Sequence, residues 1–317
     1  MRRRMLLGAL AGAVIAPIRA RAEADLGVIV PELPTGAAGT ALRVLRPFFE
    51  DALGRPVFLD FRPGAGGIVG LGAGARAAPD GATLTLLNQT VVLGPWLSTR
   101  MDCVPADFAP LGQISYVPTV LLAGRAAPWR DLAGLLADAR AGRVLTVPAP
   151  WDWRPADFAQ ALFLSRLKLA HRPLTGADRL ALLYRGAVDL AFVEADRLSG
   201  STGVRTLAVA GPARLPDLPD VPTFAEAGID LSVGSWLRLG APAATPLPIQ
   251  QHLAGALRQI LANPAATAAL RKEGIAPAWL DGAAAAKRIS AEYQAAGTLF
   301  SALGLNVRGD RRVALLE

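Results

Sequence analysis

The feature that most constrains the fold of this chain is the stretch Arg62–Gly81, RPGAGGIVGLGAGARAAPDG. It has the pattern of a glycine-rich turn, a helix of small residues and a second turn at Pro79–Gly81. A strand-like run, Val57–Leu59, precedes it, and another, Thr83–Leu87, follows it. This is one β-loop-α-loop-β unit, the building block of a parallel sheet, and it predicts an α/β fold.

The chain continues with an alternation of strand-like and helix-like segments. Short apolar runs bounded by turn residues predict strands, and apolar residues spaced three or four apart predict helices. The four prolines of Pro212–Pro222 predict an extended connection, because proline lacks the N–H that a helix interior or central strand needs. The other predicted strands are Leu26–Val30, Ala109–Ile114, Thr119–Ala123, Val144–Val147, Leu190–Val193, Arg205–Val209 and Ser235–Gly240; the predicted helices are Thr40–Leu53, Pro128–Arg140, Pro155–Leu169, Ala177–Tyr184 and a helical tail that ends with Gly282–Leu299.

A chain of 317 residues is long enough for two α/β domains of ordinary size. We expect the chain to cross between them in strand-like segments near Ala123 and again in Gly211–Ser235. The predicted division is a signal peptide over 1–22, a discontinuous domain 1 over 23–123 and 235–317, and a domain 2 over 124–234. Mainly parallel sheets joined by such a two-crossing hinge would let the domains close over a cleft.

The net charge of the chain, +7, is concentrated at its N-terminus. Arg2, Arg3, Arg4, Arg19 and Arg21 lie in the first 22 residues, which contain no acidic residue. The remainder holds 28 basic and 26 acidic residues, so its charge is nearly balanced. Because nucleic-acid binding needs a basic surface, we expect no DNA or RNA partner.

The N-terminus has the layout of a secretory signal peptide. Arg2–Arg4 forms a basic start, Met5–Ile18 an apolar core of 14 residues, and Ala20–Ala22 an A-x-A cleavage site. That core is too short to span a bilayer comfortably, which takes about 20 residues. The paired arginines indicate the Tat route, with a Sec signal or an uncleaved anchor as alternatives. The mature chain would begin at Glu23 in the periplasm, and its single cysteine, Cys103, allows no intramolecular disulfide.

The sequence contains no recognisable catalytic or cofactor-binding set. Gly64, Gly66 and Gly70 give the spacing G-x-G-x-x-x-G, which is not the dinucleotide fingerprint. The next strand ends in Asn88–Thr90, where that fingerprint requires an acidic residue for the ribose. A sharp turn and close packing of the helix on the sheet explain the glycines better. The two histidines lack metal-ligand spacing. We therefore expect a protein that is not an enzyme and has no cofactor or metal.

A polar and aromatic run, Trp151-Asp152-Trp153-Arg154, lies between a predicted strand and the helix that starts near Pro155. Ligands of open α/β sheets bind outside the carboxyl ends of strands. An arginine offers a bidentate fork for a carboxylate, and tryptophan rings offer flat apolar walls. A ligand contact and a surface loop whose tryptophans pack on their own domain are equally good interpretations of this run.

Four segments of the chain together resemble one known family. They are RPGAGGIVG…ARAAPDG, TLAVAGPARLPDLPDVPTFAEAGID, SWLRLGAPAATP and NPAATAALRKEGIAP. Their order and spacing are similar to the tripartite tricarboxylate transporter receptor family, also called Bug proteins, from about Leu26 to Leu299. The resemblance implies a periplasmic solute receptor with a type 2 periplasmic-binding-protein fold. It also implies two α/β domains that close on a small carboxylate and deliver it to a membrane permease.

In that family two strand-to-helix loops, one in each domain, hold the carboxylate by backbone N–H groups and ordered waters. The first loop usually reads P-F-P-P-G-G-A-T-D, whereas this chain has PELPTGAAG over Pro31–Gly39. Thr35 replaces a glycine, and Gly39 replaces the acidic residue. Helix N-termini suit anions because free N–H groups and the positive end of the dipole point there.

The second loop of the family usually reads G-S-x-G-x-G-x-x-x-H. The corresponding segment here, Val147–Asp157, contains no glycine and has Asp157 in place of the histidine. The acidic residue usual at the end of the next strand of domain 2 is Val193, with Glu194 beside it. The scaffold therefore matches the family better than the pocket does.

We expect a periplasmic receptor that captures a small organic acid by cleft closure for uptake by a tripartite tricarboxylate-type transporter. Its partners would be the acid and the permease subunits, and the protein would be a monomer. The alternatives are a ligand sensor that feeds a two-component signalling system, and a degenerate receptor with altered or lost ligand binding. The expected ligand-binding residues are Thr35, Gly36, Ala37, Asn88, Gln89, Thr90, Trp151, Asp152, Trp153, Arg154 and Glu194.

Overall fold

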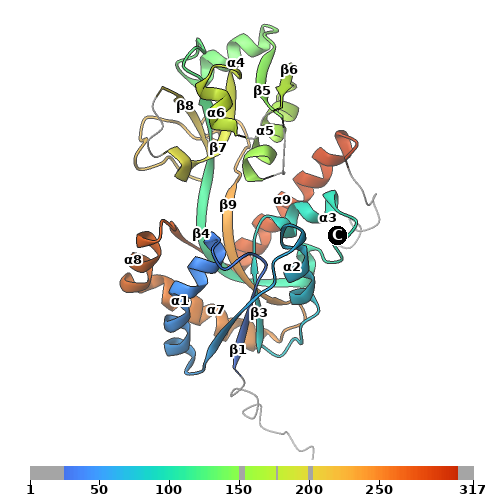
Figure 1. The fold of residues 1–317 in the computed structure, drawn as a ribbon, viewed down its shortest axis with the longest axis vertical. Coiled ribbons are helices and arrows are strands. Elements are labelled where there is room, and N and C mark those ends of the chain that lie inside the picture. The colour runs from blue at the N-terminus through green and yellow to red at the C-terminus, as the bar shows by residue number, and fades with distance from the viewer. Residues whose placement is uncertain (1–24, 150–153, 176–177, 199–202, 306–317) are drawn as a thin grey trace, which may run out of the picture.

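The computed structural model describes residues 25–149, 154–175, 178–198 and 203–305. Figure 1 shows two groups of helices and strands, one above the other, joined by the long strands β4 (Phe108–Ala123) and β9 (Gly234–Pro242). We call residues 25–118 and 234–305 the lower lobe and residues 119–233 the upper lobe. The predicted signal peptide lies outside the described residues.

The lower lobe is built on strands in the order β10-β4-β9-β3-β1-β2. The strand β1 lies between β2 and β3 and is parallel to both, as the β-loop-α-loop-β unit predicted. The strands β9 and β10 are antiparallel to their neighbours. The strands are β1 (Leu26–Val30), β2 (Val57–Phe61), β3 (Thr83–Leu87) and β10 (Pro277–Asp281); the helices are α1 (Ala37–Leu53), α2 (Ile68–Ala75), α3 (Thr90–Leu97), α7 (Leu247–Ala262), α8 (Pro264–Lys272) and α9 (Gly282–Ala302), with short 3-10 turns η2 (Ala65–Gly67) and η3 (Pro105–Asp107).

The upper lobe continues the same sheet along β4. Strands β7 and β8 both pair with the last five residues of β4, antiparallel to it. A parallel pair, β5 and β6, stands beside them. The strands are β5 (Leu145–Pro148), β6 (His171–Leu174), β7 (Leu190–Glu194) and β8 (Arg205–Ala210); the helices are α4 (Leu132–Arg140), α5 (Pro155–Arg166) and α6 (Arg179–Tyr184), with a 3-10 turn η4 (Ala195–Leu198).

The predicted α/β fold is confirmed, but the sheet is mixed, whereas mainly parallel sheets were predicted. The reason lies in the two crossings between lobes. The chain leaves the lower lobe on β4 and returns on β9, so these neighbouring strands run in opposite directions. Each lobe then adds antiparallel partners to this pair and keeps its parallel strands at one side.

The strand β4 is continuous where two strands, Ala109–Ile114 and Thr119–Ala123, were predicted. It pairs with β9 as far as Pro118 and with β7 and β8 from Thr119 onward. The predicted division into two domains stays a prediction. This change of partners favours a boundary about five residues earlier than Ala123.

The glycine-rich stretch packs as the sequence indicated. A Cβ added to Gly70 would lie 2.7 Å from the Cα of Pro31, so α2 approaches the loop after β1 too closely for any side chain. Gly67 has a φ of 101°, which glycine adopts at no steric cost. These glycines therefore serve the turn and the packing of the helix.

The two lobes also touch outside the crossing strands. Helix α9 starts in the lower lobe and its C-terminal part reaches α5 of the upper lobe (Figure 1). The Phe300 ring on α9 lies 6.2 Å from the Phe158 ring on α5, and both side chains are buried. One apolar cluster therefore extends from one lobe into the other. Within the described residues, the helices are too short or too polar to cross a membrane.

Candidate functional site

Three strand-to-helix loops of the lower lobe meet at one edge of its sheet. They follow β1, β2 and β3, whose carboxyl ends lie together because the strands are parallel. Asn88 Nδ2 donates to Glu32 Oε1 at 2.8 Å, and Thr90 Oγ1 donates to the Gly66 carbonyl at 2.7 Å. The structure thus brings Asn88 to the loop that contains Thr35–Ala37, and Thr90 to the glycine-rich loop after β2.

The N-terminus of α1 forms the next part of this edge. Gly36 is its N-cap residue and makes no side-chain cap, and the first turn contains no acidic residue. Thr35 and Ala37 are exposed, so these three predicted residues line an accessible helix terminus. Gly39 is buried, and a Cβ there would lie 2.5 Å from the Pro34 carbonyl oxygen. The acidic residue that the family resemblance implies at this position has no room.

Gln89, another predicted ligand contact, points its amide toward the protein interior. Its Nε2 donates to Glu292 Oε2 on α9 at 3.1 Å. The same carboxylate oxygen accepts a hydrogen bond from Trp236 Nε1 on β9 at 3.0 Å. Gln89 therefore connects the loop after β3 to the crossing strand β9 through Glu292.

A buried arginine completes this network. Arg238 on β9 is fully buried, and its guanidinium lies 3.8 Å from the Trp236 ring centroid and 4.0 Å from Glu292 Oε1. Burial raises the pKa of Glu292 to about 7, while Arg238, the Trp236 N–H and Arg288 partly oppose the shift. Burial also lowers the pKa of Arg238 to about 10, and the Glu292 charge partly opposes this. The network holds two ionisable groups beneath the candidate site.

The upper lobe presents Arg154 and Glu194 of the predicted residues. Arg154 is exposed and is the N-cap residue of α5, where its carbonyl accepts the Phe158 N–H at 3.0 Å. Glu194 ends β7 and stands opposite Thr119 of β4. The predicted residues Trp151, Asp152 and Trp153 lie outside the described residues.

Asp157, at the position where the family resemblance implies a histidine, serves the interior of the upper lobe. It lies in the first turn of α5, is 2% exposed, and forms an ion pair with Arg179 of α6. Arg179 Nη1 also donates a hydrogen bond to Gln160 Oε1 at 3.1 Å. The pair joins α5 to α6, so it supports the helix whose N-terminus faces the other lobe.

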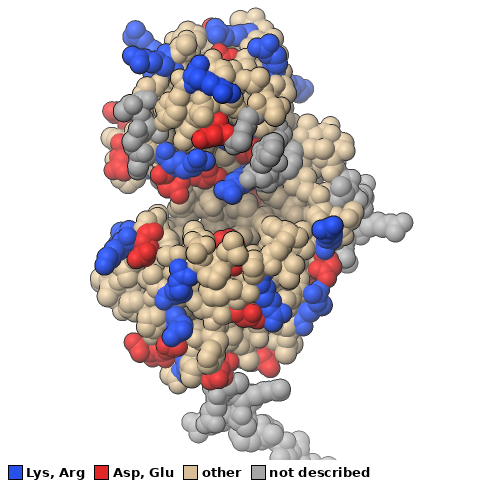
Figure 2. All heavy atoms as spheres, viewed as in Figure 1, with Lys and Arg blue, Asp and Glu red and all other residues tan. Residues whose placement is uncertain are grey.

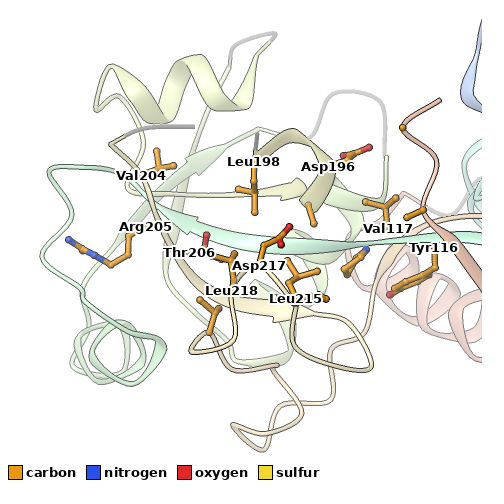
Figure 3. A pocket seen from close by; sticks show the side chains of 16 residues that line it. Tyr116, Val117, Asp196, Leu198, Val204, Arg205, Thr206, Leu215, Asp217 and Leu218 are labelled. Carbon is orange, nitrogen blue, oxygen red and sulfur yellow. The ribbon is translucent and has the colours of Figure 1, made fainter. Parts of the chain in front are cut away.

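A cavity of about 730 Å³ lies away from the predicted site residues and is lined mainly by the upper lobe, together with Tyr116–Pro118, Gly274 and Ala276 of the lower lobe (Figure 3). Its polar side chains include the carboxylates of Asp196 and Asp217 and the guanidinium of Arg205, which donates to the Trp129 carbonyl. Most other side chains that line it are apolar. None of the predicted site residues that the structure describes lines this cavity. Two carboxylates against one engaged arginine suit an anion poorly.

The space between the lobes is visible from outside. Figure 2 shows the molecule hollowed between its upper and lower parts. Within the described residues, no group of three or more His, Cys, Asp or Glu could hold a metal ion.

Sequence reasoning missed Glu32, Arg238 and Glu292. Glu32 lies directly after a predicted strand, in the very loop that the family resemblance highlighted, so its position was a usable signal. Arg238 stands inside the apolar run SWLRLG of a central strand, and both faces of central strands are covered in such folds. An arginine there has to be buried. Glu292 gave no comparable signal.

Two α/β lobes joined by crossing strands, with strand-to-helix loops at their junction, define the class of bilobal periplasmic binding proteins. The model of the tripartite tricarboxylate transporter family receptor (TctC) matches residues 41–305. The chain belongs to this family, whose members are binding proteins and not enzymes. The resemblance inferred from the sequence and the prediction of a binding protein without catalytic activity are both confirmed.

Individual relatives agree with this assignment. Protein BugT of Bordetella pertussis is 31% identical over 277 residues, which cover 79% of this chain and 80% of BugT. A TctC solute binding protein from Polaromonas, solved with no ligand, superposes with a TM-score of 0.80 at 24% identity, over 87% of this chain and 98% of that one. MatC from Rhodopseudomonas palustris, solved with bound malate, gives 0.61 at 26% identity, over 87% and 98%.

Proposed function

We propose that this chain is a periplasmic receptor that captures a small organic acid between its lobes for a tripartite tricarboxylate-type transporter. The observation that carries the proposal is the meeting of the loops after β1 and β3, joined by the Asn88–Glu32 hydrogen bond, at the edge where α1 begins. That edge lies in the lower lobe. The strands β4 and β9 connect the lower lobe to the upper lobe, which carries Arg154. Malate in MatC gives the acid class a precedent among proteins of similar structure.

The proposed mechanism is capture by closure. An acid would contact the loops Thr35–Ala37 and Asn88–Thr90 from below and Arg154 from above, together with the segment 151–153. Closure buries the solute and excludes water, which strengthens each charged hydrogen bond. No bond is made or broken. We further propose export to the periplasm by the N-terminal signal, delivery to permease subunits, and a monomeric state.

A degenerate receptor is the second candidate, and two observations favour it. The amide of Gln89 is held by Glu292, and the carboxylate at the α5 terminus, Asp157, is held by Arg179. Two positions at the junction thus serve the fold. A receptor that has lost its ligand would still keep both interactions.

Native mass spectrometry of freshly purified protein separates the two candidates, together with thermal unfolding against a panel of aliphatic and aromatic carboxylates. A receptor should carry or accept at least one acid, and a hundredfold excess over Kd stabilises the fold by about 2.7 kcal/mol. A flat response across the whole panel, with no co-purified acid, would contradict the receptor and favour the degenerate form.

Arg154→Ala tests the upper contact. We expect about tenfold weaker binding of the acid, because a hydrogen bond to a charged group contributes roughly 1.5 kcal/mol or more. Arg130→Ala, which removes another exposed arginine of the same lobe, is the control and should leave the affinity unchanged. Equal affinities for both variants and the wild type would place Arg154 outside the pocket.

A further inference from the structure

The candidate site already contains a carboxylate of the chain itself. Glu32 is the second residue after β1, and its Oε1 accepts the hydrogen bond from Asn88 Nδ2. Its other oxygen, Oε2, lies 2.9 Å from the point that a Cβ on Gly36 would occupy, beside the N-cap of α1. The residue is partly exposed, so a solute between the lobes can reach it.

The negative charge of this carboxylate has no cationic partner among the described residues. Two arginines lie on neighbouring segments, and both are engaged elsewhere. Arg62 forms an ion pair with Asp60 at 2.7 Å. Arg43 donates to the Pro34 carbonyl and to Thr40 Oγ1, the latter at 3.0 Å. A carboxylate can accept about four hydrogen bonds, so Glu32 keeps acceptor capacity beyond the Asn88 amide.

We infer that Glu32 sets the ligand class of this site: a solute with one carboxylate and, at its other end, an ammonium group that donates to Glu32. A second carboxylate placed on the loop after β1 would meet a like charge beside it, which disfavours a dicarboxylate. An ammonium there would form a charge-assisted hydrogen bond. The carboxylate end would face the upper lobe, where Arg154 is exposed. This inference rests on the proposed receptor function and narrows its substrate class.

The test uses pairs of solutes with equal skeleton length: succinate and β-alanine, glutarate and γ-aminobutyrate, adipate and δ-aminovalerate. Isothermal calorimetry of the purified chain measures each affinity. In the pair that binds best, we expect the amino acid to bind about ten- to a hundredfold tighter than the diacid, the range that one hydrogen bond to a charge contributes. Glu32→Gln should abolish or invert this preference.

Asp51→Asn is the matched control, because it makes the same charge change at an exposed position near the far end of α1. It should keep the wild-type preference, and thermal unfolding of both variants checks that they fold. Tighter binding of a diacid to the wild type would overturn the inference and leave the receptor proposal supported. An acid that binds from the wider panel while every amino acid of the series fails would also overturn it. If no carboxylate of any kind binds, the receptor proposal itself falls.

Discussion

The buried carboxylate of Glu292 should make the folding stability depend on pH, and Glu292→Gln isolates the effect. Glu292 is 13% exposed at its side chain and faces Arg238 and Trp236 of β9, Arg288 of its own helix, and Gln89. Burial raises its pKa to about 7 in the folded protein, against an ordinary value of 4.5. Glutamine keeps the shape and the acceptor oxygen and does not titrate.

The sign and size follow from proton linkage. Between pH 4.5 and about 7 the unfolded chain releases a proton that the folded protein retains. The free energy of unfolding therefore falls as the pH rises through this window and stays level above it. One pKa unit corresponds to about 1.4 kcal/mol, so the whole loss is roughly 3 kcal/mol.

Urea unfolding of the wild type and of Glu292→Gln, at about pH 5 and about pH 8, measures this loss. As the pH rises across that range, the wild type should lose roughly 3 kcal/mol of unfolding free energy relative to Glu292→Gln. Any constant offset from the substitution cancels in this comparison. Glu273→Gln, at an exposed glutamate, should show no comparable movement. Parallel pH curves for the wild type and Glu292→Gln would refute a buried, proton-retaining Glu292.

Two further predictions concern packing and ion pairing. Gly70→Ala should lower the unfolding free energy by about 1–3 kcal/mol, because the new Cβ would press on Pro31. Gly255→Ala should raise it by about 0.5–1 kcal/mol, because Gly255 lies in the middle of α7 with open space around it. Thermal unfolding measures both shifts, and two shifts of the same sign would contradict the prediction. Asp157→Asn should cost about 3–5 kcal/mol in urea unfolding, since it leaves the guanidinium of Arg179 without its buried carboxylate, and a change below about 1 kcal/mol would mean that the pair is not buried in solution.

Local patterns predicted most of the secondary structure, and the misses have physical causes. The helix α3 (Thr90–Leu97) was not predicted because Gly94 and Pro95 disfavour a helix, yet most of its residues are buried, and packing decides its conformation. The strand β10 (Pro277–Asp281) begins with a proline, which disfavours a strand interior, and it pairs with β4 at the partly exposed edge of the sheet. The continuity of β4 depends on pairing with β9, some 120 residues away, which periodicity does not reveal.

The candidate site was predicted less completely than the fold. The strand ends placed Asn88 and Gly36 correctly at one edge, since parallel strands bring their carboxyl ends together. The positions of strand ends do not show which way each side chain points. Gln89 neighbours Asn88 in sequence, but its amide turns inward to Glu292, because a buried carboxylate there requires donors.

The inward orientation of the Gln89 side chain gives the lower lobe a physical link between the candidate site and the crossing strands. Gln89 belongs to the loop after β3, Trp236 belongs to β9, and both donate to the same oxygen of Glu292. The helix that carries Glu292 also reaches the upper lobe through the contact of Phe300 with Phe158. A closing motion that moved α9 or β9 would therefore alter the burial of Glu292 and its pKa. By thermodynamic reciprocity, a solute that favours closure and a proton on Glu292 would then influence each other's binding by the same factor.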